Sequence, residues 1–205
     1  MLKEIFESLA GVYSEDKPEI NRRWLEIENA YSGNGRYYHN LTHLENLLAE
    51  LQGFRPMIDN WNVVLWAMYY HDIVYDPLRS DNEAESVVLA ENRLKMLNVP
   101  QPEIEACAAM IFATKGHQVS EHPDINLFTD ADLSILGKEK DDYHTYASNV
   151  RREYAIYPDS LYNPGRKNVL QHFLAMEQIF KTEVFRNKYE VQARANIREE
   201  MERLG

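Results

Sequence analysis

The chain has 205 residues, of which 44% are hydrophobic and 27% charged, so it can bury a substantial core as one domain or as two small ones at most. Its 22 basic and 33 acidic residues give a net charge of −11. No basic block offsets this charge, which argues against a protein that binds the backbone of a nucleic-acid polymer.

The first two predicted helices carry apolar residues at steps of three or four. Residues 1–10 show this pattern with acidic residues among them, whereas a signal peptide has a basic start and an uninterrupted apolar stretch. Pro18 can open a second helix, which Ser32 and Gly33 end. The single cysteine, Cys107, rules out an internal disulfide and is typical of a reducing compartment. We expect a cytoplasmic protein with no membrane partner.

The next two predicted helices bring polar residues to their ends. Asn40 or Thr42 can cap a helix with a leucine-rich core face, and His43 lies in its first turn. Residues 61–70 form the most apolar run of the chain, too short to span a bilayer and too continuously apolar for a surface helix. We expect this run to be buried on all sides and to deliver His71 and Asp72 into the interior.

Six further helices are predicted from apolar periodicity in the rest of the chain. They cover residues 81–97, a segment with Ile104, Cys107, Ile111 and Phe112, residues 125–136 before Gly137, and residues 143–154, 169–180 and 191–204. No stretch alternates as a strand does, and no repeat or linker interrupts the chain. The predicted fold class is therefore all-α, a single domain over residues 1–205 with roughly nine or ten helices.

Histidines and carboxylates stand at the ends or in the first turns of these apolar helices, and three of the helices can therefore converge on one point. Two imidazoles with two carboxylates suit a divalent ion such as Mn²⁺, Fe²⁺ or Zn²⁺, with positions left open for water. The alternative is that His43 and His71 are core histidines, hydrogen-bonded to Asp132 or to a backbone carbonyl. Asp130 is predicted to start a helix or to orient a ligand histidine.

Along the chain, a histidine is followed by a His-Asp pair and then by an aspartate. This order resembles the signature of the HD-domain superfamily of metal-dependent phosphohydrolases. Four stretches are also similar to a bacterial subgroup described as predicted metal-dependent HD-superfamily phosphohydrolases: Arg36-x-Tyr38-His39-Asn40-Leu41-x-His43, His71-Asp72-x-Val74-Tyr75-Asp76, Asp81-Asn82-Glu83 and residues 130–137. The resemblance covers about residues 36–137 and implies an HD-like helical bundle. It implies hydrolysis of a small phosphorylated molecule such as a nucleotide, with a divalent Mn, Fe, Zn or Mg ion held by His43, His71, Asp72 and Asp132.

Two relatives suggest roles for single residues. The stretch from Tyr38 to His43 resembles the opening motif of cyclic-nucleotide phosphodiesterases, which would make His39 the acid that protonates the leaving oxygen; otherwise His39 hydrogen-bonds within its loop. Asp72 would both bind the ion and orient a water, with Asp76 as a nearby base. The same run resembles the alarmone hydrolases, except that Tyr75 replaces an acidic residue.

Four residues are predicted to contact the substrate: Arg36, Lys115, His117 and Arg166. The alternative is that each is a solvated surface or loop residue. The missing acidic residue at Tyr75 also favours a second function, a metal- and nucleotide-binding sensor or scaffold without turnover. A helical interaction domain that has lost its ligands is a third hypothesis, which the retained histidines and carboxylates disfavour.

Overall fold

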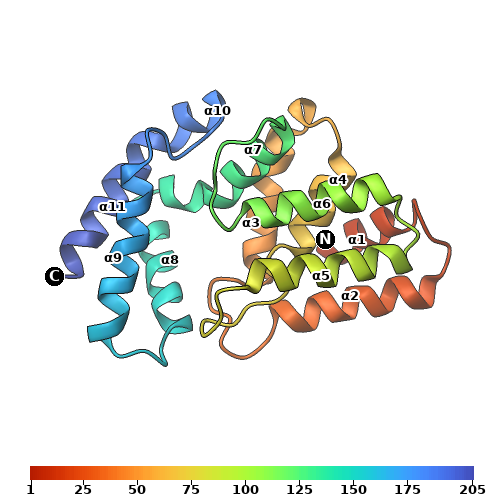
Figure 1. Ribbon diagram of the computed structural model, residues 1–205, viewed down its shortest axis with the longest axis horizontal. Helices are drawn as coiled ribbons and strands as arrows, with labels where there is room; N and C mark the ends of the chain where they lie inside the picture. The colour runs from red at the N-terminus through yellow and green to blue at the C-terminus, as the bar shows by residue number, and fades with distance from the viewer. The chain divides into compact units, whose positions relative to one another are not determined.

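The computed structural model describes all 205 residues and contains ten α-helices of nine to seventeen residues, one three-residue helix and no β-strand (Figure 1). This confirms the all-α prediction. The chain forms two compact units, Met1–Thr129 and Asp130–Gly205. None of its helices combines the length and the apolar character that a membrane span requires.

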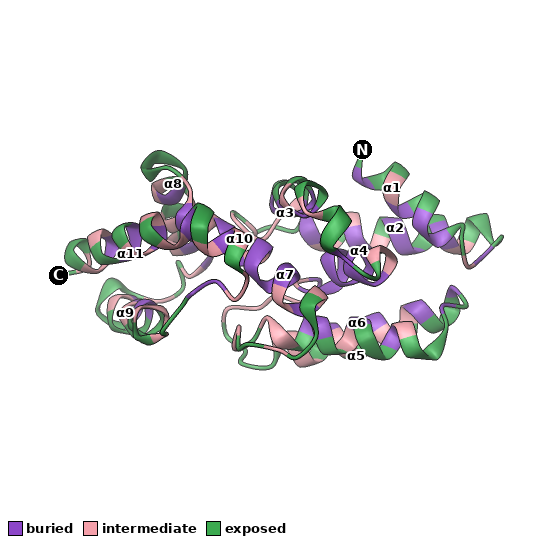
Figure 2. Ribbon diagram, turned by 90° about the horizontal axis from the view of Figure 1, so that it is seen from above, coloured by how far each residue is buried: buried purple, intermediate pink, exposed green.

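The core of the first unit is built on α4 (Trp61–Tyr70), which packs against α3 (Leu41–Gly53), α5 (Asn82–Met96) and α6 (Gln101–Ala113). Every residue of α4 from Val63 to Tyr70 is buried, as its purple ribbon shows (Figure 2). The prediction of a helix buried on all sides is confirmed. Because each large apolar side chain contributes about 1.5–3 kcal/mol on burial, this short helix anchors the whole unit.

The helices α1 (Leu2–Ala10) and α2 (Lys17–Tyr31) close the unit through aromatic contacts. The Phe6 ring meets Trp66 and Tyr69 of α4 edge-on, with centroids 5.7 and 5.2 Å apart. The Tyr69 hydroxyl donates a hydrogen bond to the backbone oxygen of Leu2 at 2.8 Å. Edge-to-face pairs and this buried hydrogen bond fix α1 on α4.

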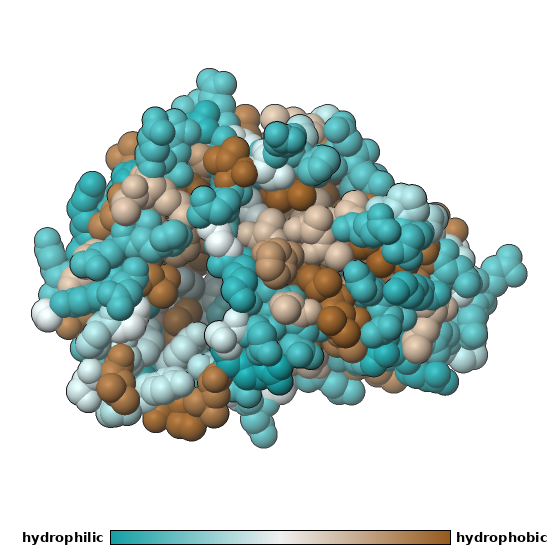
Figure 3. Space-filling view, viewed as in Figure 1, coloured by the Kyte–Doolittle hydropathy of each residue, from teal (hydrophilic) through white to brown (hydrophobic).

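The helices α5 and α6 run side by side at the surface of the unit. Their buried sides hold residues such as Leu94 and Ile111, while Val88 and Phe112 are each 55% exposed. Figure 3 shows brown apolar side chains over these two helices among teal polar ones. The buried face of α6 runs through Ile104, Cys107, Met110 and Ile111, and Phe112 points away from it.

The second unit contains α8 (Lys140–Glu153), α9 (Asp159–Ala175), α10 (Glu183–Phe185) and α11 (Val191–Arg203). A 3₁₀ turn, Leu133–Gly137, and a π-helical turn, Arg186–Glu190, pack on each other and on α11. A Cβ added at Gly137 would lie 2.5 Å from the Tyr189 Cβ. Only glycine therefore permits this close approach.

A buried polar cluster ties three helices of the second unit together. The Arg166 guanidinium of α9 donates to the Glu200 carboxylate of α11 at 2.8 and 3.1 Å, and the Tyr143 hydroxyl of α8 donates to the same carboxylate. The negative charge of Glu200 is thus balanced inside the unit, as a buried carboxylate requires.

Two predicted helix boundaries are wrong. The helix predicted at 169–180 is α9, which begins ten residues earlier at Asp159 and ends at Ala175. The helix predicted at 125–136 is α7 (Pro123–Asp132) followed by the 3₁₀ turn. The apolar spacing of the first helix also continues to Val12, but α1 ends at Ala10 and Val12 is 66% exposed.

Candidate metal centre

The start of α3 places His43 in the interior. The Asn40 side chain caps the helix by accepting hydrogen bonds from the backbone N–H groups of Thr42 and His43, at 2.9 and 3.2 Å. This satisfies donors that the first turn of a helix leaves unpaired. The predicted cap is confirmed, and the buried His43 side chain lies in the first turn as expected.

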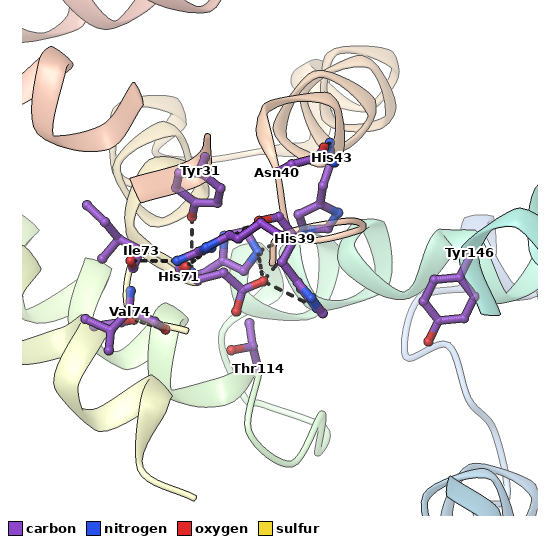
Figure 4. Close-up of polar contacts among 12 residues, drawn as sticks. Tyr31, His39, Asn40, His43, His71, Ile73, Val74, Thr114 and Tyr146 are labelled. Carbon is purple, nitrogen blue, oxygen red and sulfur yellow. Dashed lines mark hydrogen bonds and ion pairs between the residues drawn. The ribbon is translucent and has the colours of Figure 1, made fainter. Parts of the chain in front are cut away.

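The end of α4 places His71 opposite His43. The Nδ1 atom of His71 lies 3.0 Å from the backbone oxygen of Met68, and the two Nε2 atoms of His43 and His71 lie 3.1 Å apart (Figure 4). A carbonyl oxygen only accepts hydrogen bonds, so the His71 proton resides on Nδ1. The Nε2 atom, which faces His43, is then the one available to a metal ion.

The spacing of these two nitrogens suits a shared ion. Two nitrogens that each lie about 2.1 Å from one ion are separated by roughly 3.0 Å at a right angle and roughly 3.4 Å at a tetrahedral angle. The observed 3.1 Å falls between these values. The pair can therefore serve as neighbouring ligands of one divalent ion.

Asp72 turns its carboxylate toward the same nitrogens. Its Oδ2 atom lies 3.1 Å from the His71 Nε2 and 3.9 Å from the His43 Nε2. Burial would raise the pKa of the Asp72 carboxyl, but the imidazoles of His71, His39 and His43 hold this pKa well below its usual range. Three imidazoles thus lie around one carboxylate.

His39 borders this group on the more exposed side. Its Nε2 atom lies 3.9 Å from the Asp72 Oδ2. The Tyr75 ring packs on the His39 ring at a tilt of 31°, with centroids 4.3 Å apart. The Tyr38 ring contacts His39 edge-on at 4.9 Å. Two tyrosines thus hold the imidazole beside the carboxylate.

The last residue of α7 supplies a further carboxylate. The Phe128 ring of α7 packs edge-on against His71, with centroids 5.8 Å apart. Asp132 follows Phe128 by four residues and so lies on the same face of the helix. His43, His71 and Asp132 form a group of side chains that could hold a metal ion.

Arg36 holds the backbone on both sides of the centre, although it was predicted to bind phosphate. Its Nη1 atom donates to the backbone oxygens of His39 and Asp72, at 3.1 and 2.6 Å, and its Nη2 atom donates to the Ile73 oxygen at 2.9 Å. The guanidinium carbon also lies over the rings of Tyr31 and Tyr75, 4.9 and 5.3 Å from their centroids.

Side chains of α5 hold the rest of the loop after His71. The Ser86 hydroxyl accepts from Val74 N at 3.2 Å and donates to Val74 O at 3.4 Å. The Asn82 amide accepts from Asp76 N at 3.1 Å and donates to Asp76 O at 2.9 Å. The loop is irregular, so these side chains replace the partners that a helix or sheet would give its backbone.

The other predicted site residues lie in different settings. The Asp76 carboxylate accepts from Leu78 N at 2.9 Å, which closes a turn. The Lys115 ammonium donates to the backbone oxygen of Ser80 at 2.9 Å. His117 adopts a positive φ of 48° in the loop after α6. Arg166 belongs to the buried pair with Glu200 in the second unit.

Asp130 neither starts a helix nor orients a histidine among the contacts observed, which corrects both readings of this residue. It lies near the end of α7, fully buried. Its carboxylate accepts from the backbone N–H groups of Lys181 and Thr182, at 2.8 and 2.7 Å. Asp130 therefore fastens the chain that leads into α10.

Sequence reasoning missed three groups that support the centre: the Met68 carbonyl, the Tyr31 hydroxyl, which accepts from Asp72 N at 3.2 Å, and Ser86. Ser86 alone left a signal, because it lies one turn after Asn82 on a helix face that continues with the apolar Ala90 and Leu94. Comparisons with protein-family models, with curated proteins and with solved structures found no match to this chain.

Proposed function

We propose that this protein is a metal-dependent phosphohydrolase of the HD type that acts on a small phosphorylated molecule such as a nucleotide. One observation carries the proposal. The His71 Nε2 atom, whose ring keeps its proton on Nδ1, faces both the Asp72 carboxylate and the His43 Nε2 atom at 3.1 Å. A lone pair directed at an ionised carboxylate is repelled unless a positive charge lies between them.

We propose that a divalent ion, bound by His43, His71, Asp72 and Asp132, supplies this positive charge. A second proton on His71 would also supply it, but only as an imidazolium buried among other imidazoles. When bound, such an ion supplies Lewis acidity, which lowers the pKa of coordinated water and offsets charge on phosphoryl oxygens. The mixed nitrogen and oxygen donors fit Mn²⁺, Fe²⁺ or Zn²⁺ better than Mg²⁺, which prefers oxygen ligands.

The chain's own residues would then divide the work of hydrolysis. Asp72 would orient the attacking water through its carboxylate. His39, on the more exposed side of Asp72, would protonate the departing oxygen, and Asp76 or Asp72 would accept the proton of the water. Lys115 and His117, from the loop after α6, are the candidates for phosphate contacts.

The experiment measures hydrolysis by the purified full chain with Mn²⁺ on a panel of nucleotides, sugar phosphates and alarmones. We expect phosphate release that is abolished in Asp72→Asn and kept in Asp59→Asn, a matched aspartate in the turn before α4. Activity that survives Asp72→Asn at the wild-type level would refute the mechanism.

A metal- and nucleotide-binding sensor without turnover is the second candidate. Its support is that Tyr75 stands where an acidic residue is found in the alarmone hydrolases and that its ring covers one face of His39. In that case a nucleotide raises the melting temperature of the metal-loaded protein and is recovered unchanged after long incubation. Release of inorganic phosphate would exclude this candidate.

A further inference from the structure

We propose that Arg36 is a positioning residue that fixes the His39 imidazole relative to the Asp72 carboxylate, and that it does not bind the phosphate of the substrate. The inference rests on the proposed function and deepens it. His39 precedes α3 and Asp72 follows α4, so the two residues belong to segments far apart in the chain. Arg36 donates hydrogen bonds to the backbone of both residues.

The edge of the guanidinium that carries Nη1 and Nη2 is already committed to the protein. Both hydrogens of Nη1 are used by the His39 and Asp72 carbonyl oxygens, and Nη2 donates to Ile73. A phosphate that binds arginine by two parallel hydrogen bonds needs a free edge of the guanidinium plane. Here the edge that carries Nη1 and Nη2 is occupied by carbonyls, and two tyrosine rings pack on the group.

The Nη1 atom of Arg36, which binds both segments, explains how Arg36 sets the distance between His39 and Asp72. Two carbonyl oxygens point at one Nη1 atom, at 3.1 and 2.6 Å. Without the guanidinium these oxygens would repel each other, and the two segments would separate. The His39 Nε2 would then move away from the Asp72 Oδ2, which now lies 3.9 Å away. A displacement of about 1 Å at a reacting group is enough to cost roughly 100-fold in rate.

Two substitutions distinguish positioning from phosphate binding. Arg36→Lys keeps the charge, but a compact ammonium cannot span three carbonyls, and Arg36→Gln removes the charge. With bis(p-nitrophenyl) phosphate and Mn²⁺, positioning predicts that both lower kcat by about 10- to 100-fold with little change in KM. The Mn²⁺ content should stay at the wild-type level. A phosphate clamp would instead raise KM, and Arg36→Lys would retain most of the activity.

Chemical rescue supplies a second readout. Arg36→Ala leaves a space shaped for a guanidinium ion, so millimolar guanidinium should restore much of its kcat. The control is Arg22→Ala, because Arg22 is an exposed arginine of α2 with a side chain 67% exposed. Guanidinium should leave this variant and the wild type unchanged. No rescue of Arg36→Ala in an otherwise folded protein would overturn the inference.

Backbone hydrogen exchange separates failure of this inference from failure of the proposed function. If the wild type hydrolyses no phosphate compound, the proposed function is wrong, and Arg36 is judged by exchange alone. Positioning predicts faster exchange in Arg36→Ala at residues 39–40 and 72–74 together, reversed by guanidinium. Unchanged exchange at either segment would contradict the role of Arg36.

Discussion

The Nε2 atoms of His43 and His71 lie 3.1 Å apart although 28 positions separate the two residues in the chain. A capped first turn of α3 supplies one ring and the end of a fully buried helix supplies the other. The hydrogen bond from His71 Nδ1 to Met68 O sets the tautomer that exposes the second nitrogen.

Loss of His71 should abolish metal binding. His71→Ala removes one candidate ligand nitrogen from the interior and leaves His43 without its partner, so we expect the metal content of protein purified without added metal to fall at least about tenfold. Elemental analysis measures it. His122→Ala is the matched control, since His122 lies exposed in the loop before α7. Equal metal content in all three proteins would contradict the assignment.

Protons should compete with metal binding at low pH, where the ion must displace them from its ligands. Both Nε2 atoms and the Asp72 carboxylate must be free of protons to bind an ion. The affinity for Mn²⁺ should therefore fall as the pH falls below about 6.5, the pKa of free histidine. Titration calorimetry in buffers of different ionisation enthalpy counts the protons released. An affinity independent of pH between about 5.5 and 7.5 would count against histidine ligands.

Alkali should destabilise the fold through its buried tyrosines. Burial raises the pKa of the Tyr69, Tyr70 and Tyr143 hydroxyls well above the ordinary value of 10.0, and burial likewise raises the pKa of Tyr162 to about 12. Above pH 10 the unfolded chain loses phenolic protons that the folded chain keeps, so the free energy of unfolding falls as pH rises.

Urea unfolding at pH 8 and pH 11, followed together with tyrosinate absorbance, checks this expectation. Tyr70→Phe should show a smaller loss of stability between the two pH values, because it removes one group whose pKa differs between the folded and unfolded states. If all 13 tyrosines ionise at their ordinary pKa while the protein stays folded, the burial described for these rings is wrong.

Gly137→Ala should destabilise the second unit. The added Cβ would meet the Tyr189 Cβ at 2.5 Å and its backbone oxygen at 2.7 Å, and overpacking of this kind costs about 1–3 kcal/mol. Gly165→Ala is the control, since nothing lies within 4 Å of a Cβ there and alanine favours a helix by about 0.5–1 kcal/mol. Thermal unfolding should therefore shift in opposite directions, and a stable Gly137→Ala would disprove the close approach.

Cys107 should be inert in the folded protein. Burial raises the pKa of its thiol well above its ordinary value, and only the thiolate reacts with alkylating agents. Iodoacetamide at pH 8 should label the protein in urea and leave the native protein unlabelled. Rapid labelling of the native protein would show that α6 opens readily.

The sequence predicts the first unit better than the second for a physical reason. The apolar run of α4 and the Asn40 cap of α3 are local signals, and each produces the element that it predicts. In α9, Pro164 and the exposed Leu161 disguise the first turns, so the helix was placed ten residues late. Ile179 and Phe180 are buried, which suggested a helix, but they lie beyond the end of α9. Burial alone does not imply a helical backbone.

In the candidate site, too, the sequence predicts what depends on local signals and misses what depends on the folded backbone. His43, His71 and Asp72 could be found because they stand at the ends of apolar helices, where a buried polar group needs a partner. The contacts of Arg36 could not, because they depend on the directions of three carbonyl groups in irregular loops. A sequence shows the charge of an arginine and leaves its hydrogen-bond partners open.

The central claim is that one divalent ion is held between these imidazoles, and an anomalous difference map from crystals grown with Mn²⁺ tests it most directly. We predict a single strong peak about 2.0–2.3 Å from the Nε2 atoms of both His43 and His71, with a carboxylate oxygen completing the site. Fully occupied manganese elsewhere in the crystal, with no peak between His43 and His71, would contradict the claim.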